Sequence, residues 1–418
     1  MLSSCRHFPD CGGCQILDLE YSEQLLAKEE ELRRHFTDWP GLAIEPVLPS
    51  PRIYGYRHKV QLPFGLEGRG LEWKDMKRRG MGANAPAVLA TVGCYAAGSH
   101  VVVDQEECLV QDAGLSQAAW AVRNWANSHG VPVYREDSGE GWLRHLLLRK
   151  GATTGEILLG LVTNGPGTGP QSLIQDLVQR IQAALASTEG DIRNELVGIV
   201  QSLNSERNNV VLGGEERLLW GRPQLKEILG PFTFPVGMST FFQVNPFQTP
   251  RLYDLAVAAI PPGADALDLY SGLGSIALWA SRRAGFVLGI EENPAAVESA
   301  RLAARENGVT NVEFLEADVA RALTEGAPGS GAKGEGGLGG RRFDVAIVDP
   351  PRKGLEASVR DSLCKLGLSR IVYVSCFPPT LARDAKAMAG SFRLVSLVPV
   401  DMFPHTRHVE CVAVFDRV

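Results

Sequence analysis

The chain has 418 residues, 44% of them hydrophobic and 22% charged, with a formal net charge of -6 at pH 7. This length suggests two or three domains, and no apolar run approaches the roughly 18 residues that a membrane helix needs. The net negative charge argues against a protein that coats nucleic acid through bulk electrostatics. Because the first ten residues (MLSSCRHFPD) lack the features of a secretory signal, we expect a cytoplasmic protein that binds no membrane.

The chain opens with a cysteine-rich segment. The whole sequence holds eight cysteines, and a disulfide framework is not expected because the cytosol keeps thiols reduced. Metal binding or catalysis is the explanation for clustered cysteines. We interpret Cys94, Cys364 and Cys411 as small buried hydrophobes, the usual role of an isolated cysteine.

Residues 21–36 (YSEQLLAKEEELRRHF) carry apolar side chains at helical spacing and Glu–Arg pairs four residues apart, which predicts one helix. From about residue 46 to residue 234, short strand-like runs alternate with Gly and Pro. These runs are HVVV, LRHLLLR, EILLGLVT, GIVQSLN and NVVLG. We predict a β-rich domain here, with a helix around residues 171–185.

A basic stretch within this region is a candidate for contact with nucleic acid. Residues 54–59 (YGYRHK) are joined by four further basic residues: Lys74, Lys77, Arg78 and Arg79. Taken alone, such residues are more often a solvated charged face. A nucleic-acid activity argued from other residues would favour the interpretation that Tyr54, Tyr56 and Arg57 stack on or clamp RNA.

After residue 266 the pattern changes to alternating strands and helices. Strands are expected at ALDLY, FVLGIE, VEFLEAD, FDVAIV and IVYVSC, with helices beginning at Ser275 and Pro294. Such alternation is typical of a parallel sheet with helices on both faces. Asn293 is placed to cap the second helix and Gly308 to end it. Residues 324–342 are too rich in glycine to bury a core, so we expect a surface loop.

The segment LDLYSGLG (residues 267–274) predicts a strand that runs into a glycine-rich turn and a helix, where the backbone can approach a ligand. Glu291 ends the next strand about 20 residues later, where a carboxylate can bind ribose hydroxyls. The full G-x-G-x-x-G fingerprint of dinucleotide sites is missing. S-adenosylmethionine therefore fits better than NAD, and Asp318 at the end of VEFLEAD could reach the adenine.

Two further strand ends carry candidate catalytic residues. Asp349 begins the segment DPPR after a buried strand, at the edge of the sheet where α/β proteins bind ligands. Cys376 ends IVYVSC, so its sulfur should emerge at the same edge. A thiolate can attack carbon 6 of uracil and so make carbon 5 nucleophilic enough to accept a methyl group. In the segment DMFPHTRHVE, the base that removes the carbon 5 proton is Glu410, His405 or His408 by spacing alone.

Together these motifs resemble the RNA uracil-5-methyltransferase family, whose members make 5-methyluridine in 23S rRNA or in the T-loop of tRNA. The resemblance covers most of the chain and rests on FFQVNP, DLYSGLG, DPPRKG, YVSC followed by TLARD, and DMFPHTRHVE. It implies a Rossmann-like class I methyltransferase domain at the C-terminus, with Cys376 as the nucleophile and Glu410 as the base. It also implies a set of cofactor-binding residues: Gln243, Tyr270, Ser275, Glu291, Asp318 and Asp349.

The same resemblance implies an N-terminal 4Fe-4S cluster. Cys5, Cys11 and Cys14 have the spacing C-x5-C-x2-C, and Cys108 in EECLVQD is the fourth ligand. By residue type alone the four thiolates could instead hold zinc, and His7 could compete as a ligand. The expected domains are therefore an iron-sulfur segment at 1–45 with its fourth cysteine at 108, a central β-rich RNA-binding domain at 46–235, and a methyltransferase domain at 236–418.

The sequence also departs from the family pattern. Some relatives begin with a small β-barrel ahead of the cysteines, and we expect this chain to lack it. The glycine-rich loop is longer than in relatives, and Ser275 stands where many of them carry Asn. The cysteine block CRHFPDCGGCQ resembles that of the family members that act on rRNA, which implies 23S rRNA as the substrate in preference to tRNA. We expect the enzyme to be a monomer. RNA cytosine-5 methylation ranks second, and RNA binding without catalysis is the third hypothesis.

Overall fold

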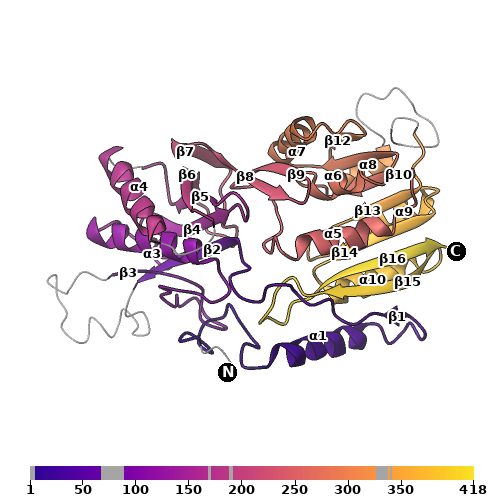
Figure 1. The fold of residues 1–418 in the computed structure, drawn as a ribbon, viewed down its shortest axis with the longest axis horizontal. Coiled ribbons are helices and arrows are strands. Elements are labelled where there is room, and N and C mark those ends of the chain that lie inside the picture. Colours follow the sequence, from indigo (N-terminus) through magenta and orange to yellow (C-terminus); the bar gives the residue numbers. More distant parts are fainter. Residues whose placement is uncertain (1–4, 67–88, 168–170, 188–191, 326–337, 339–340) are drawn as a thin grey trace. The chain divides into compact units, whose positions relative to one another are not determined.

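The structure is a computed structural model that describes residues 5–418 except for residues 67–88, 168–170, 188–191, 326–337 and 339–340. Lys74, Lys77, Arg78, Arg79 and most of the glycine-rich loop lie outside the described residues. The chain divides into two compact units (Figure 1). The first unit comprises Met1–Leu17, Ile53–Ile228 and Val236–Ser239, and the second comprises Asp18–Arg52, Leu229–Pro235 and Thr240–Val418. No helix of the described chain has the length and hydropathy to span a bilayer.

The first unit is built on a six-stranded sheet in the order β3-β2-β4-β5-β6-β7. The bounds are β2 Lys59–Leu66, β3 Ala90–Val92, β4 Leu143–Lys150, β5 Glu156–Thr163, β6 Glu195–Leu203 and β7 Glu215–Gly221. Neighbouring strands are antiparallel except for β5 and β6, which are parallel. Two helices, α3 (Ala113–Ser128) and α4 (Gln171–Ala186), lie beside the sheet (Figure 1). Their apolar side chains are buried in one core with it.

The predicted elements of this unit are partly confirmed. The runs LRHLLLR, EILLGLVT and GIVQSLN form β4, β5 and β6, and the helix at 171–185 is α4. Two predicted strands are wrong. HVVV makes only an isolated bridge at Val102, and NVVLG is a loop because the side-chain amide of Asn204 holds the carbonyl oxygens of Val210 and Val211, at 2.6 and 3.0 Å. Helix α3, capped by Asp112, was not predicted.

The second unit is built on an eight-stranded sheet in the order β1-β15-β16-β14-β13-β10-β11-β12. The bounds are β1 Ala43–Ile44, β10 Asp265–Leu269, β11 Phe286–Glu291, β12 Val312–Glu316, β13 Val345–Val348, β14 Arg370–Ser375, β15 Phe392–Val400 and β16 Glu410–Arg417. Five neighbouring strands of this sheet run parallel to one another: β14, β13, β10, β11 and β12. Strand β16 is antiparallel to both of its neighbours, β14 and β15. The hairpin strands β8 (Gln224–Leu229) and β9 (Phe232–Gly237) form a separate two-stranded sheet.

Helices cover both faces of this sheet, as expected for an α/β unit. One core joins the sheet to α1 (Tyr21–His35), α8 (Val319–Glu325), α9 (Ala357–Lys365) and α10 (Pro378–Met388). The strands are also contacted by α5 (Thr249–Ala258), α6 (Ser275–Ala280) and α7 (Pro294–Glu306). Asp268 alternates with the core residues Leu267 and Leu269, and its carboxylate lies near the backbone of Ala277, so α6 lies on the opposite face.

The predicted alternation of strands and helices is confirmed in this unit. Asn293 caps α7 by accepting hydrogen bonds from the backbone amides of Ala295 and Ala296, at 3.0 and 3.3 Å. Gly308, directly after the C-cap residue, has a φ of 65°. The mixed α/β fold predicted from the sequence is therefore correct, and its parallel strands determine where the candidate site residues lie.

Candidate functional site

Three of the predicted cofactor residues follow parallel strands that end at the same level. Leu269 of β10 pairs with Ile290 of β11 on one side and with Val348 of β13 on the other. The residues that come next in the three strands are Tyr270, Glu291 and Asp349. Because carboxyl ends of parallel strands share one edge of the sheet, these three residues lie along a single edge, as the sequence predicted.

The turn after β10 requires an unusual backbone. Tyr270 has a φ of 65°, a conformation that non-glycine residues rarely adopt, and Gly274 has a φ of 79°. A Cβ on Gly274 would lie 2.5 Å from the ring of Phe314, and one on Gly289 would lie equally close to it. Both glycines therefore allow the turn and β11 to pack on the Phe314 ring.

Backbone amides orient the carboxylates at this edge. Glu291 accepts a hydrogen bond from the amide of Gly272 at 3.0 Å and another from Asn293 at 2.9 Å. These bonds hold the side chain beside the glycine-rich turn. Asp318 is exposed and accepts a hydrogen bond from the amide of Arg321 at 2.8 Å, so one of its oxygens caps α8.

Other side chains support the turn, and some of them were not predicted. The hydroxyl of Ser275 lies 2.8 Å from that of Tyr253, a buried residue of α5. Gln243 is also buried. Its loop is held by Asn245, whose side-chain amide donates to the Ser50 hydroxyl at 3.2 Å and to the Met402 carbonyl at 3.1 Å. The bonding partners of Asn245 are distant in the sequence, so no local pattern identified this contact.

The candidate nucleophile and base lie on paired strands. Ser375 of β14 is paired with Cys411 of β16 in an antiparallel register, which makes Cys376 and Glu410 the next neighbours along the two strands. Cys376 is half-buried, whereas Glu410 is 2% exposed. The predicted pair is therefore brought together by the register of the sheet, across a sequence separation that no local pattern reveals.

The site around Cys376 is crowded with acidic groups. Burial, together with the charges of Glu410 and Asp349, raises the pKa of the Cys376 thiol to about 12, although Arg352 opposes this effect. Burial and the neighbouring Asp349 raise the pKa of Glu410 to about 8, and burial raises the pKa of Asp349 to about 7. Burial and Asp349 also raise the pKa of Asp268 above its usual range. Burial therefore favours the neutral form of each of these groups.

The two histidines of the C-terminal segment contact residues other than Cys376 and Glu410. The backbone amide of buried His405 donates to Gln24 Oε1 at 2.9 Å, and His405 Nδ1 lies 3.0 Å from Gln24 Nε2. His408 is exposed, with Nδ1 3.2 Å from Arg352 Nη2. Of the three candidates for the base, Glu410 is the one whose strand register places it beside Cys376.

The N-terminal cysteines share one small cavity in the first unit. A cavity of about 20 Å³ is lined by cysteines and a few other residues: Cys5, Cys11, Cys14, Cys94, Cys108, Phe8, Arg57 and Gln105 among them. The four predicted ligands thus converge, and Cys94 joins them although its sequence position suggested a buried hydrophobe. His7 is not among the residues that line the cavity. Across the described residues, however, no three Cys, His, Asp or Glu side chains are arranged as a metal site.

The donors around Cys11 suit an anionic sulfur. Gln105 Nε2 donates to Cys11 Sγ at 3.0 Å and the Gly13 amide donates at 3.4 Å. Hydrogen bonds to ligand sulfurs are one of the ways in which proteins tune iron-sulfur clusters. The donor set therefore fits a thiolate-bound group chemically.

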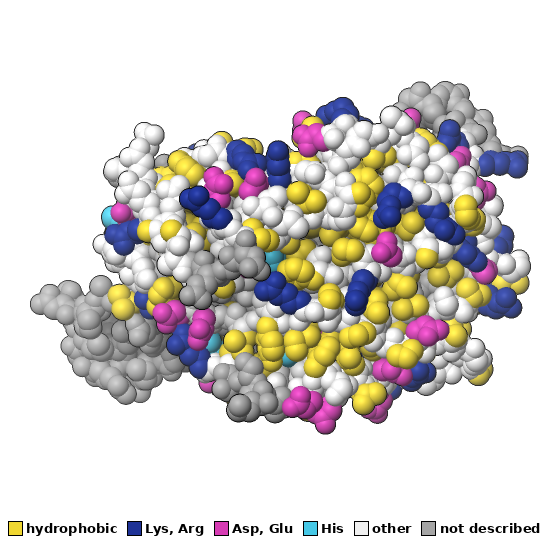
Figure 2. All heavy atoms as spheres, in the orientation of Figure 1, with side chains coloured by type: hydrophobic (Ala, Val, Ile, Leu, Met, Phe, Trp, Pro, Cys, Tyr) yellow, Lys and Arg dark blue, Asp and Glu magenta, His cyan; other side chains and the backbone are white. Residues whose placement is uncertain are grey.

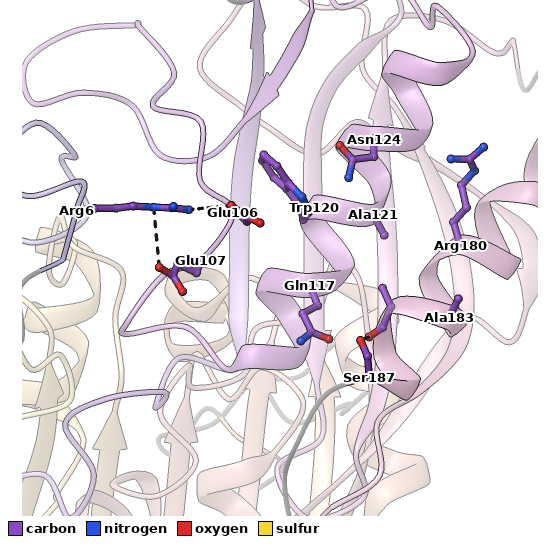
Figure 3. Close-up of a pocket in the computed structure, with 11 residues that line it drawn as sticks. Arg6, Glu106, Glu107, Gln117, Trp120, Ala121, Asn124, Arg180, Ala183 and Ser187 are labelled. Carbon is purple, nitrogen blue, oxygen red and sulfur yellow. Dashed lines mark hydrogen bonds and ion pairs between the residues drawn. The ribbon is translucent and has the colours of Figure 1, made fainter.

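A second cavity of the first unit contains none of the predicted ligands or catalytic residues. It measures about 680 Å³ and lies beside α3 and α4, with Trp120, Asn124 and Arg180 on its walls (Figure 3). Arg6 forms ion pairs there with Glu106 and Glu107, at 3.2 and 3.9 Å. These pairs connect the segments that carry Cys5 and Cys108.

The interpretation of Tyr56 as an RNA-stacking residue needs correction. Tyr56 has no exposed surface, whereas Arg57 is half-buried and lines the cysteine cavity, so its contact with RNA stays a prediction. On the face seen in Figure 2, Lys and Arg side chains are scattered among acidic ones and form no single basic patch among the described residues. This distribution agrees with the net charge of -6.

Comparison with known proteins identifies relatives over the full chain. Residues 234–418 match the family model of tRNA (Uracil-5-)-methyltransferases. A Leptospira interrogans protein named as an uncharacterized RNA methyltransferase is 38% identical over 415 residues, covering 99% of this chain and 98% of the relative. A Clostridium acetobutylicum protein with a similar name is 33% identical over 428 residues, covering 99% of this chain and 83% of the relative.

A solved structure agrees with these relatives. The tRNA (uracil-54, C5)-methyltransferase of Pyrococcus abyssi, in complex with S-adenosyl-L-homocysteine, superposes with a TM-score of 0.71 at 27% identity. The match covers 97% of this chain and 86% of the Pyrococcus chain. The chain belongs to the RNA uracil-5-methyltransferase family, a family of S-adenosylmethionine-dependent enzymes.

Proposed function

We propose that this enzyme transfers a methyl group from S-adenosylmethionine to carbon 5 of a uridine in RNA, through a covalent bond between Cys376 Sγ and carbon 6 of the base. The observation that carries this proposal is the antiparallel register that makes Cys376 and Glu410 neighbours. Asp349 and the glycine-rich turn follow strands of the same sheet. A nucleophile, a base and a binding site for the methyl donor therefore belong to one unit.

The proposed steps use these residues in turn. Cys376 Sγ bonds to carbon 6, which pushes the electrons of the carbon 5–carbon 6 double bond onto carbon 5 and its neighbouring carbonyl. Carbon 5 then takes the methyl group and releases S-adenosylhomocysteine. Glu410 removes the remaining carbon 5 proton, and the returning electron pair expels the Cys376 thiolate.

The raised pKa of Cys376 requires that its proton leave before attack. Burial first, and then the neighbouring Glu410 and Asp349, disfavour the thiolate and raise the pKa of the thiol to about 12. Transfer of the thiol proton to Asp349, whose own pKa is near 7, keeps the net charge of the site constant. Glu410, whose pKa is about 8, must lose its own proton before it can accept the carbon 5 proton.

For the methyl donor we propose the predicted set: Gln243, Tyr270, Ser275, Glu291, Asp318 and Asp349. Support comes from their positions at the edge of the sheet and around the turn after β10. The Pyrococcus relative was solved with S-adenosyl-L-homocysteine, and the same product would bind here. When bound, S-adenosylmethionine would supply the methyl group and a positive sulfonium charge near the acidic residues.

We further propose that Cys5, Cys11, Cys14 and Cys108 hold a 4Fe-4S cluster. Support comes from their shared cavity and from the donors to Cys11 Sγ. When bound, the cluster would stabilise the N-terminal segment and orient RNA. The same thiols would bind zinc in the alternative interpretation.

The RNA we propose first is 23S rRNA, because the cysteine block CRHFPDCGGCQ resembles that of the family members that act on rRNA. Transfer RNA is the second candidate, favoured by the Pyrococcus relative, which acts on uracil-54 of tRNA. In either RNA the target base would have to leave its stack to reach Cys376. RNA cytosine-5 methylation ranks below both, because the prolines of DPPRKG are not followed by a second cysteine.

The test uses anaerobically purified full-length protein, labelled S-adenosylmethionine, and separate unmodified 23S rRNA and tRNA transcripts. Mass spectrometry of the digested RNA identifies the methylated nucleoside. The proposal expects 5-methyluridine in one transcript and none with the Cys376→Ala protein. Finding 5-methylcytidine would replace the proposal with the cytosine reaction, and RNA binding without methyl transfer would favour a non-catalytic role.

A further inference from the structure

A fully buried carboxylate that takes no part in the proposed reaction contacts the strand that leads to Cys376. Asp384, in α10, has 0% of its surface exposed. Its Oδ2 accepts hydrogen bonds from the Leu355 amide at 2.8 Å and the Tyr373 hydroxyl at 2.9 Å. Its Oδ1 accepts from Arg360 Nη1 at 2.8 Å and from Arg383 Nη2 at 2.7 Å. Both oxygens are therefore saturated by donors, two of them charged.

These donors come from the two segments that carry the chemistry. Tyr373 lies in β14, whose next residue after the strand end is Cys376. Leu355 ends the turn that begins after Asp349 and its two prolines. Asp384 is thus bonded to the strand of the proposed nucleophile and to the loop of a proposed cofactor residue at the same time.

Other side chains of α10 donate hydrogen bonds to backbone carbonyl oxygens of the same turn. The Thr380 hydroxyl donates to the Arg352 carbonyl at 3.3 Å, and Arg383 Nη2 donates to the Lys353 carbonyl at 2.9 Å. Gly354 lies between Lys353 and Leu355 in the turn and has a φ of 74°. A Cβ at this position would be 2.6 Å from Asp384 Oδ2. Gly354 of DPPRKG and Asp384 of TLARD are therefore in direct contact.

We propose that Asp384 is a positioning residue of the methyl-transfer site, which sets the distance between the Asp349–Arg352 turn and the Cys376 sulfur. This inference rests on the proposed role of Cys376. Helix α10 begins at Pro378, two residues after Cys376, so a carboxylate anchored in this helix links the nucleophile to the turn rigidly. A displacement of about 1 Å at a reacting centre can cost on the order of 100-fold in rate.

The test separates positioning from stability with matched variants in the full-length protein. Asp384→Asn keeps the shape but removes the charge that Arg360 and Arg383 face. Tyr373→Phe removes only the bond to β14. Met388→Ala, in the same helix, removes buried apolar contact and leaves the Asp384 bonds in place. Asp416→Asn breaks the pair with Arg370 at the other end of β14.

Single-turnover rates, KM for S-adenosylmethionine and melting temperature are measured for each variant. We expect Asp384→Asn to lower the single-turnover rate about 100-fold and Tyr373→Phe to lower it about 10-fold, with KM changed less than about threefold. Met388→Ala should lower the melting temperature without lowering the rate of folded enzyme. Asp416→Asn should leave the rate unchanged.

The second readout is the covalent complex with RNA that carries 5-fluorouridine at the target position. Fluorine cannot be removed as a proton is, so the methylated adduct on Cys376 persists. Positioning predicts slower adduct formation in Asp384→Asn and Tyr373→Phe. Rates equal to wild type in both, or an equal loss in Met388→Ala, would overturn the inference. Absence of any adduct with the wild-type protein would instead overturn the proposed role of Cys376.

Discussion

Lys28 Nζ lies 2.6 Å from Asp401 Oδ1, and both side chains are almost completely shielded from solvent. Lys28 also donates to the Phe403 carbonyl at 3.0 Å, and Tyr21 donates to Asp401 Oδ2 at 2.8 Å. Burial lowers the pKa of Lys28, and the charge of Asp401 opposes this shift. Helix α1 is thereby fixed to the segment that leads to Glu410.

Replacing Lys28 with Met should destabilise the second unit by about 3–5 kcal/mol, because Asp401 would be left buried without its cation. Urea unfolding followed by tryptophan fluorescence measures the change. Lys386→Met is the control, since Lys386 pairs with Asp38 at the surface and its loss should have no measurable effect. Equal stability of the two variants would contradict a role for the buried pair.

Replacing Glu410 with Gln should stop the reaction after methyl transfer. The base would be missing, so turnover should fall about 100-fold or more, while the Cys376–RNA adduct accumulates. A denaturing gel detects the adduct as a slow band that nuclease removes. Glu313→Gln, at an exposed position of β12, is the control. An inactive Glu410→Gln protein without any adduct would show that Glu410 acts before the methyl transfer.

The raised pKa of Glu410 makes stability depend on pH. The folded protein keeps the proton up to about pH 8, whereas the unfolded chain loses it near pH 4.5. The folded state therefore binds more protons between these values, and stability should fall as the pH rises through this window. Glu410→Gln should be more stable than wild type at pH 8, by on the order of a few kcal/mol, with a smaller difference at pH 5. Melting curves at both pH values measure this, and a pH-independent difference would contradict it.

The cysteine cavity makes a prediction about metal content. Replacing Cys11 or Cys108 with Ser should abolish iron binding in anaerobically purified protein, because each would supply one of four ligands. Cys364→Ser, in α9 of the other unit, should keep the wild-type content of about four iron atoms per chain. Cys94→Ser should also keep it, if Cys94 contacts Cys11 without binding the metal. Zinc in place of iron in the wild-type protein would favour the alternative site.

The sequence predicted those features that depend on local pattern. Strand ends marked by DPP and by YVSC located Asp349 and Cys376, because a buried strand followed by a turn places the next residue at the edge of the sheet. The caps of α7 could be predicted for the same reason, since Asn293 and Gly308 act on neighbouring backbone groups.

Contacts between distant segments could not be predicted in this way. Cys94 looked like an isolated hydrophobe because its neighbours in the cavity are up to 89 residues away in sequence. Asp384 carries no local sign that its donors come from two other segments. Helix α3 was missed because its apolar positions are filled largely by alanine, which marks a helical stripe weakly.

An early segment of the chain belongs to the unit that is otherwise formed by the C-terminal half, and this affects folding during synthesis. Residues 18–52 belong to the second unit, and β1 pairs with β15, which is made more than 340 residues later. At about 5–20 residues per second, α1 must wait roughly 20 to 70 seconds on the ribosome for its core partners. During that time Leu32 and Phe36, which are buried in the finished core, remain uncovered. The nascent chain therefore presents an early apolar segment for chaperones to shield, and the fold of the catalytic unit closes only when its last strands emerge.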